Sequence, residues 1–160
     1  GYFNFPRSVA VSRHNELHVV DMLNFRVQVF DAQGRLMRFF GEAGAGAPGR
    51  FDKIHSIGFD SFDNVYVADA VQGVHVLSAE GTALMVFGPP VARAPSAVVV
   101  SSKNAIYVAD LLAGVHEFQL VNTTAEDSRR KSTPAAPAAP AAPAATGATP
   151  SAPAPAKPAP

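Results

Sequence analysis

The chain has 160 residues, no cysteine, and 13 Lys or Arg against 13 Asp or Glu, so its length allows one domain with or without a tail, and disulfides, thiolate catalysis and thiolate zinc sites are excluded. Residues 1–121 alone carry nine basic and eleven acidic side chains, a balance that argues against non-specific binding of nucleic acid, which depends on cations that neutralise phosphates. The longest apolar runs fall far short of the ~20 residues that a membrane-spanning helix needs.

A seven-residue pattern that ends in Asp occurs three times along the chain. It spans 15–21, 63–69 and 104–110, and its aspartates are separated by 48 and then 41 residues. A short apolar run lies about ten residues before each of these aspartates, and another run follows each of them. A fourth run ends at Gly41 and again at Gly88. The chain therefore repeats one unit, and a period of this length is typical of repeat architectures.

The runs of each unit have the character of short β-strands. They are four to six residues long, rich in β-branched and aromatic side chains, and bounded by turn formers. In two units a turn ending in Gly34 or Gly81 joins the third run to the fourth, and glycine adopts the positive φ that such a hairpin needs. No window of ten or more residues has helical periodicity with caps. The pattern predicts an all-β fold in which each unit is one four-stranded blade of a β-propeller.

The units also resemble a known family, the NHL repeat. The residues that carry the resemblance in the first unit are Phe5–Val11, Leu17–Asp21, Asn24–Asp31 and Phe40–Gly41. The second unit departs from the pattern, since Ile54 stands where the first and third units have proline. Because NHL propellers usually have six blades, the resemblance implies the C-terminal half of one, with about three blades. The predicted repeats of this partial propeller, residues 1–121, lie at about 5–50, 51–88 and 89–121.

The third unit lacks a fourth strand and is followed by a segment of different composition. From Thr133 onward nine of 28 residues are proline and most of the others are alanine, so residues 122–160 are predicted to form a disordered tail. In closed propellers a strand from the beginning of the chain often completes the last blade, which removes exposed strand edges. We therefore expect that missing N-terminal blades, or a second copy of the chain, are needed to close the ring.

The order of strands within a blade predicts where a ligand would bind. The residues that begin the innermost strands should surround one mouth of the central channel, and the residues that end the second strands should lie slightly outside them. Loops of all blades converge on such a face. The predicted ligand-binding residues are Arg7, His55 and Ser96 at the mouth, and Asp21, Asp69 and Asp110 outside it.

These two groups of residues differ in how they vary between units. An Asp ends the second strand of every unit, which favours a role in folding, because an Asp there can accept backbone N–H bonds from the next turn. Arg7, His55 and Ser96 differ from one another, which fits ligand contact and fits solvent-facing positions equally well. An ion pair between Arg7 and Asp21 is a further structural alternative.

Five histidines raise the question of a metal site. His75 and His116 hold the same position in adjacent units, too far apart to share an ion at the ~2 Å of a His–Zn bond. His18 stands where the other units have tyrosine, a packing position. Only His55 is well placed, so no metal site, no cofactor and no catalytic set are predicted. The NHL-like amidating lyases use metal-binding histidines around the channel, so the resemblance keeps a metal-dependent lyase as an alternative.

The favoured function is non-catalytic binding, in which a propeller scaffold recognises a protein or a small ligand on its channel face. Because the NHL family includes extracellular sensor domains, the resemblance favours a periplasmic, secreted or surface-attached protein over a cytoplasmic one. The alternative is a metal-dependent lyase or hydrolase that uses His55. RNA binding, which the resemblance also offers, is disfavoured by the acidic balance, so no nucleic-acid partner is expected.

Overall fold

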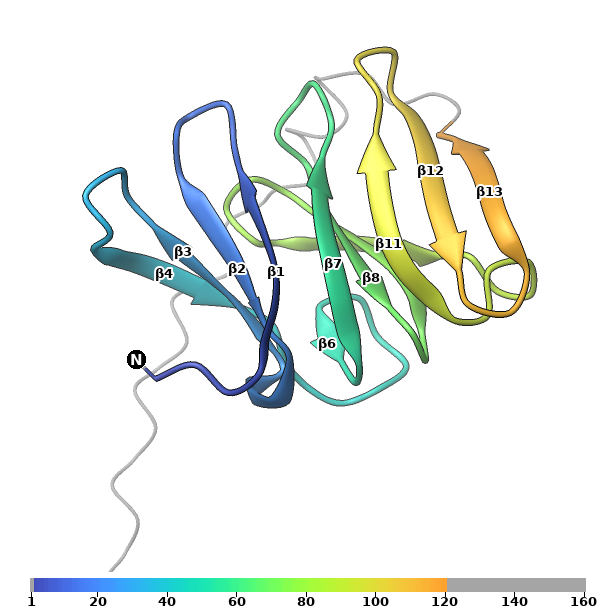
Figure 1. Ribbon diagram of the computed structural model, residues 1–160, viewed down its shortest axis with the longest axis horizontal. Coiled ribbons are helices and arrows are strands. Elements are labelled where there is room, and N and C mark those ends of the chain that lie inside the picture. Colours follow the sequence, from blue (N-terminus) through green and yellow to red (C-terminus); the bar gives the residue numbers. More distant parts are fainter. Residues whose placement is uncertain (1, 121–160) are drawn as a thin grey trace, which may run out of the picture.

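The computed structural model of the protein describes residues 2–120. The predicted tail, residues 122–160, lies outside them. Three antiparallel β-sheets stand side by side, and the chain passes from one to the next in sequence order (Figure 1). This arrangement confirms the predicted all-β propeller fold with about three blades. Among the described residues the one helical segment is a 3-10 turn, η1, at Met22–Asn24.

In each blade, consecutive strands pair to form a meander. The first blade consists of β1 (Pro6–Val11), β2 (Leu17–Asp21), β3 (Arg26–Phe30) and β4 (Leu36–Phe40). The second consists of β7 (Ile54–Phe59), β8 (Val65–Asp69), β9 (Gly73–Leu77) and β10 (Ala83–Phe87). The third has three strands within the described residues: β11 (Pro95–Val100), β12 (Ala105–Asp110) and β13 (Gly114–Gln119). A short parallel pair, β5 (Glu42–Ala43) and β6 (Arg50–Phe51), links the first blade to the second.

The first strands of the three blades, β1, β7 and β11, are the inner strands. They pack against one another between blades and run in the same direction (Figure 1). We call the end of the molecule at which they begin the starting face. The second strands β2, β8 and β12 are antiparallel to them and therefore end on this face. In each blade, the pairing places the first residue of the inner strand beside the aspartate that ends the second strand.

An Asn or Asp precedes each second strand in a left-handed backbone conformation. Asn15, Asp63 and Asn104 have φ values of 58°, 63° and 61°. In the first blade the N–H of Asn15 donates to the carbonyl of Ser12 (2.9 Å), and the N–H of Ser12 donates to the carbonyl of Glu16 (3.0 Å). The same two bonds recur in the other blades. Asn and Asp tolerate this conformation better than other non-glycine residues, which explains why they begin the repeated pattern.

Two apolar cores fill the spaces between the blades, and their burial is the main stabilising contribution to a fold of this kind. The buried residues between the first and second blades are Val20, Met22, Val27, Val29, Phe40, Phe51, Ile54, Ile57, Val65, Val67 and Leu77. The buried residues between the second and third blades are Tyr66, Ala68, Val74, Val76, Ala92, Val98, Ile106 and Val108. The second blade therefore contributes one face to each core.

Equivalent residues of the three blades differ in exposure at the two ends of the row. Val9, Ile57 and Val98 occupy the same position in the inner strand, each opposite a valine of the second strand. Ile57 and Val98 are 5% and 2% exposed because a preceding blade covers them, whereas Val9 is 64% exposed. On the other side of the sheets Val74 is fully buried, whereas its equivalent Val115 is 72% exposed. The first and last blades thus each leave exposed part of a face that is buried in their neighbours.

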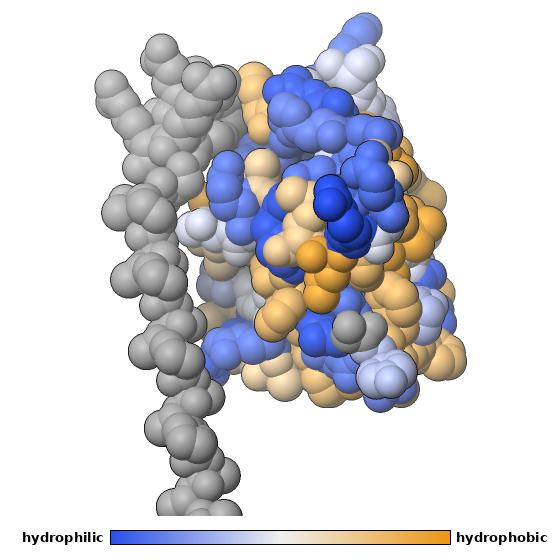
Figure 2. Space-filling view, turned by 90° about the vertical axis from the view of Figure 1, so that its left-hand side faces the viewer, coloured by the Kyte–Doolittle hydropathy of each residue, from blue (hydrophilic) through white to orange (hydrophobic). Residues whose placement is uncertain are grey.

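The bare face of the first blade is in view in Figure 2, where apolar side chains lie exposed among charged ones. Its exposed apolar residues include Val9, Val11 and Phe39. The bare face of the third blade, at the other end of the row, includes Val99, Tyr107 and Val115. Each of these faces has the composition of a surface that packs against another blade.

Candidate functional site

Asp69 ends β8 and is fully buried at the starting face. Its Oδ2 accepts hydrogen bonds from the backbone N–H groups of Asp52 (2.7 Å) and Lys53 (3.1 Å), just before the inner strand β7. Its Oδ1 accepts from the N–H groups of Val71 (2.9 Å) and Gln72 (3.2 Å), in the turn that follows β8. The carboxylate therefore ties the start of the inner strand to the turn after the second strand, which is a folding role.

Asp110 repeats this arrangement in the third blade. The N–H of Ala94 donates to its Oδ2 at 2.6 Å. The N–H groups of Leu112 and Ala113 donate to its Oδ1 at 2.8 and 3.0 Å. Burial acts to raise the pKa of Asp110, but the backbone hydrogen bonds outweigh it and hold the pKa below its ordinary value. The negative charge at this position is therefore already compensated by the protein.

Asp21 has the same task in the first blade but uses different donors. The backbone N–H of Asn4 donates to its Oδ1 at 2.6 Å. The side chains that donate to its Oδ2 are Asn24 (2.8 Å), Arg26 (3.0 Å) and Gln28 (2.8 Å). The turn after Asp21 is one residue longer than the other two, and side chains replace the backbone donors that the shorter turns supply. Burial acts to raise the pKa of Asp21, and these four donors together lower it below its ordinary value.

Arg7, His55 and Ser96 are the second residues of the inner strands, and each lies at a β-bulge. In the first blade the pairing with β2 skips from Pro6 to Ser8, so Arg7 has no partner across the ladder. The second and third blades show the same shift in register at the same position. A bulge re-aims a side chain, and bulges are common beside binding sites. The three predicted mouth residues therefore lie at the same end of adjacent inner strands, outside the regular pairing.

These bulge residues differ in how far the protein satisfies their polar groups. The exposed Arg7 forms no ion pair within the described residues, and Asp21 pairs with Arg26 (3.0 Å) instead, so the alternative of an Arg7–Asp21 ion pair is wrong. The hydroxyl of Ser96 donates to the carbonyl of Ala109 at 3.1 Å. Of these two positions, only Arg7 keeps its polar group free for a ligand.

His55 is 7% exposed, and its buried Nδ1 has no hydrogen-bond partner in the protein. Burial lowers the pKa of His55, and the positive charges of Arg7 and Lys53 lower it further against an opposite effect of Asp69. The imidazole is therefore neutral at pH 7. A buried polar atom without a partner costs about 1–3 kcal/mol. Lys53 is a site residue that the sequence analysis did not predict. Its place immediately before the inner strand β7 is the one feature of the sequence that could have identified it.

At the opposite end of the inner strands, ion pairs and hydrogen bonds join neighbouring hairpins. The Nε of Arg13 lies 2.6 Å from Oδ2 of Asp63, and His14 Nε2 lies 2.9 Å from the same oxygen. Arg13 also donates to the carbonyl of Ser61 (2.7 Å), whose N–H donates to Asn104 (3.1 Å). These bonds connect three consecutive blades. Most of the charges at this end are therefore paired, and Lys103 is the exception among its described cations.

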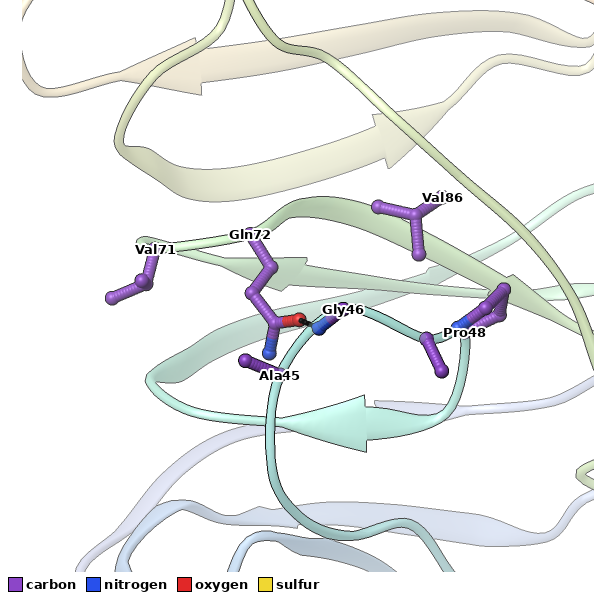
Figure 3. A pocket seen from close by; sticks show the side chains of 7 residues that line it. Ala45, Gly46, Pro48, Val71, Gln72 and Val86 are labelled. Atoms are coloured by element: carbon purple, nitrogen blue, oxygen red, sulfur yellow. Dashed lines mark hydrogen bonds between the residues drawn. The ribbon is translucent and has the colours of Figure 1, made fainter.

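A shallow hollow of about 530 Å³ lies beside the link between β5 and β6 (Figure 3). Its lining consists of Ala45, Gly46, Ala47, Pro48, Val71, Gln72 and Val86. Gln72 is its polar side chain, and both ends of the amide are bonded to the link. The Oε1 accepts from the N–H of Gly46 (3.0 Å), and Nε2 donates to the carbonyls of Gly44 (2.9 Å) and Arg50 (3.0 Å). The hollow therefore offers mainly apolar contacts, and Gln72 acts as a clamp on the link.

The other buried histidines have packing roles. His18 is 1% exposed and lies edge-on to Phe59 at 4.9 Å between ring centroids. His75 is fully buried, and its Nδ1 accepts a hydrogen bond from the N–H of Gly49 (3.2 Å). In the part of the chain that the structure describes, no three His, Cys, Asp or Glu side chains lie close enough together to hold a metal ion. Nor is any helix of that part long and apolar enough to span a membrane.

Comparison by sequence gives one informative relative. No family model matches the chain. Protein brain tumor of Drosophila melanogaster is 28% identical over 117 residues, which cover 69% of this chain. The matched part is 11% of the Drosophila protein, so the chain spans a small part of that relative's length.

Comparison with solved structures identifies the fold. The WD40 β-propeller domain of Doa1 matches with a TM-score of 0.62 and 17% identity, over 76% of this chain and 38% of that chain. Virginiamycin B lyase from Staphylococcus aureus matches with a TM-score of 0.54 and 12% identity, over 75% of this chain and 42% of the lyase. At these identities the likeness shows the fold alone. The chain has a propeller-type fold and spans less than half of each of these solved propellers.

Proposed function

We propose that residues 1–121 are part of an NHL-type propeller whose starting face binds a ligand without transforming it. The observation that carries this proposal is the different use of two neighbouring sets of side chains. The repeated aspartates are occupied by hydrogen bonds that hold the blades together. Beside them, bulges present a free cation at Arg7 and a partner-free buried imidazole at His55.

The variation between blades supports recognition by this face. A binding surface needs different donors and acceptors at defined places, and two of the three equivalent bulges supply an unbonded guanidinium and an unbonded imidazole, whereas the third carries the bonded hydroxyl of Ser96. Because the bulges lie on paired strands, their positions are held by the sheet rather than by a mobile loop. The NHL assignment itself is supported by the quoted motif residues, since Asn24 and Arg26 of that motif hold the Asp21 carboxylate.

A ligand screen with matched variants tests this function. The chain would be screened by thermal shift against a library of small metabolites and short peptides. Compounds that bind the starting face should lose their shift in the double variant Arg7→Ala/His55→Ala. They should keep it in Lys103→Ala, which removes an exposed charge from a hairpin at the other end of an inner strand. If every bound compound were equally insensitive to both variants, the proposed site would be wrong.

A metal-dependent lyase or hydrolase is the second candidate, and His55 is the observation that favours it. A neutral imidazole with a free nitrogen is the form that binds a metal ion. The other ligands would have to come from outside the described residues. Recovery of each bound compound by mass spectrometry distinguishes the two functions, because binding returns the compound unchanged. Conversion of the compound, together with one retained zinc ion per chain after gel filtration, would support the lyase or hydrolase instead.

A further inference from the structure

Two cations at the starting face differ from most other cations of the described residues, because their side chains form no ion pair and no hydrogen bond. In the described residues every other arginine is bonded to a carboxylate or a carbonyl, whereas Arg7, Lys53 and Lys103 have neither an ion pair nor a side-chain hydrogen bond. Arg7 and Lys53 belong to adjoining inner-strand starts, since Arg7 lies in β1 and Lys53 immediately precedes β7. Two of the three free cations therefore gather at one end of one pair of packed strands.

The acidic groups nearby do not form ion pairs with these two cations. Asp69 is the carboxylate that acts on His55, and its two oxygens are already bonded to four backbone N–H groups. Asp52 is the exposed carboxylate of this stretch, and it lies in the link ahead of the inner strand. Of the described carboxylates near these two unpaired cations, Asp69 is thus already bonded, and Asp52 is the one that remains unpaired.

His55 adds a donor that lacks a partner. Its side chain is more than nine-tenths buried, and neither ring nitrogen is bonded within the described residues. Because Nδ1 is closed to solvent, Nε2 is the nitrogen that a ligand can reach. In the tautomer that carries its proton on Nε2, this atom donates a hydrogen bond to a bound acceptor. Carboxylate and phosphate oxygens are strong acceptors, and they are also the groups that a guanidinium binds through two parallel hydrogen bonds.

We infer that the starting face between β1 and β7 binds a small anion that carries a carboxylate or phosphate group, held by Arg7, Lys53 and His55. This inference deepens the proposed binding function and rests on it. Arg7 supplies the forked donor, Lys53 supplies a second positive charge, and Nε2 of His55 supplies a neutral donor that fixes the position of the anion. The backbone cages around the aspartates keep their negative charges from competing for the same donors.

Equilibrium dialysis of the full 160-residue chain, in the assembly that it forms in solution, tests this inference. Labelled inorganic phosphate and labelled succinate would be used in separate experiments at constant ionic strength in sodium chloride. We expect saturable binding of one anion per chain, and the tighter of the two probes identifies the anionic group. Arg7→Gln should weaken that binding by about tenfold or more, because it removes a charge-assisted pair of hydrogen bonds.

Two further variants separate a built site from general charge. Lys103→Gln removes an equally free charge at the other end of the inner strands and should change the affinity by less than about twofold. His55→Leu should weaken binding, whereas His55→Gln, which keeps an N–H donor, should restore part of it. Arg7 is exposed, so Arg7→Gln remains informative if a His55 variant fails to fold.

Two results would overturn the inference. One is the absence of saturable binding of either anion, and the other is an equal loss of affinity in Arg7→Gln and Lys103→Gln. If neither anion bound, while a neutral compound from the ligand screen depended on Arg7 and His55, the anion would be wrong and the binding function would stand. If no ligand of any kind depended on these residues, both would fail.

Discussion

The aspartates at the ends of the second strands are repeated because the fold uses them, and for the same reason they are unavailable to a ligand. Asp21, Asp69 and Asp110 are 0%, 0% and 6% exposed. Each lies on the starting face, where its position alone would suit ligand binding. Their oxygens are instead bonded to the start of the inner strand and to the turn beyond. A residue on the right face is therefore a candidate only while its polar atoms remain free.

Replacing Asp69 should cost much of the stability of the second blade. Asp69→Ala leaves four backbone N–H groups without their acceptor, so we expect a loss of about 3–5 kcal/mol in the free energy of unfolding. Asp52→Ala removes an exposed carboxylate from the neighbouring link and should cost less than about 0.5 kcal/mol. Urea unfolding followed by circular dichroism measures both. A loss below about 1 kcal/mol for Asp69→Ala would contradict the folding role.

Stability should fall when the pH is lowered from 7.5 to 5.5. Burial lowers the pKa of His18 and of His75 in the folded chain. The unfolded chain therefore binds more protons below about pH 6.5, so the stabilisation is complete above that pH and is lost as the pH falls. The maximum slope is about 1.4 kcal/mol per pH unit for each histidine. Urea unfolding at three pH values between 7.5 and 5.5 measures the slope.

The residue that occupies the position of His75 in the first blade suggests the control for this slope. Gln28 occupies in the first blade the position that His75 occupies in the second, opposite the equivalent valine of the second strand. His75→Gln should therefore be tolerated in size and should remove the share of the slope that His75 contributes. An unchanged slope in this variant would show that His75 does not titrate as proposed.

The turn that joins the second strand to the third differs in length between the blades. The longer turn of the first blade contains η1 and ends in Phe25 at a φ of 53°, and the shorter turns of the other blades have Gly73 and Gly114 at 108° and 90°. The surroundings of these two glycines differ, because the second blade has a fourth strand, β10, and the third blade has none within the described residues. A methyl group on Gly73 would strike the carbonyl oxygen of Phe87, at the end of β10, whereas nothing lies within 4 Å of one on Gly114.

This contrast predicts unequal costs for the same substitution in two blades. Gly114→Ala should cost about 1–2 kcal/mol, the strain of a left-handed residue that has a side chain. Gly73→Ala adds a collision with backbone to that strain and should cost at least about 2 kcal/mol more. Urea unfolding of both variants measures the difference. Equal costs would mean that the end of β10 yields to the new methyl group.

The row of blades ends in two complementary faces. Within the molecule, the face represented by Ile57 or Val98 packs against the opposite face of the preceding blade. The first blade exposes Val9, on the face that corresponds to that of Ile57 and Val98. The third blade exposes Val115, on the opposite face. One chain therefore carries both halves of the blade interface. A head-to-tail contact of this kind closes into a ring if the rotation between copies allows it.

We expect the 160-residue chain to self-associate at micromolar concentration through these two faces. Exposed apolar faces drive association, and repeat folds are stabilised by contacts between neighbours. Val9→Asp or Val115→Asp should weaken the association by about tenfold or more, because each places a charge in an apolar interface. Gln33→Asp, in the exposed turn between β3 and β4, should leave it unchanged. Sedimentation velocity measures the association, and a well-folded monomer would contradict the account of the two faces.

Local patterns along the chain were enough to predict the blades. The short β-branched runs became strands, and the Asn or Asp before each second strand adopted the left-handed conformation that its residue type tolerates. Gly34 and Gly81 took φ values of 76° and 91° in the predicted turns. The third blade stopped at three strands within the described residues. These features depend on neighbours a few residues away, so the order of residues alone determines them.

Contacts between distant segments of the chain decide whether each polar group at the starting face is bonded or free. The sequence places Arg7, His55 and Asp21 near one mouth, but it does not show that Arg26 rather than Arg7 bonds Asp21, or that Nδ1 of His55 is buried without a partner. The bulges also escaped prediction, because a shift in register is a property of two paired strands. Whether a side chain is free for a ligand follows from the packing and pairing of the blades, and these are fixed only when the chain is folded.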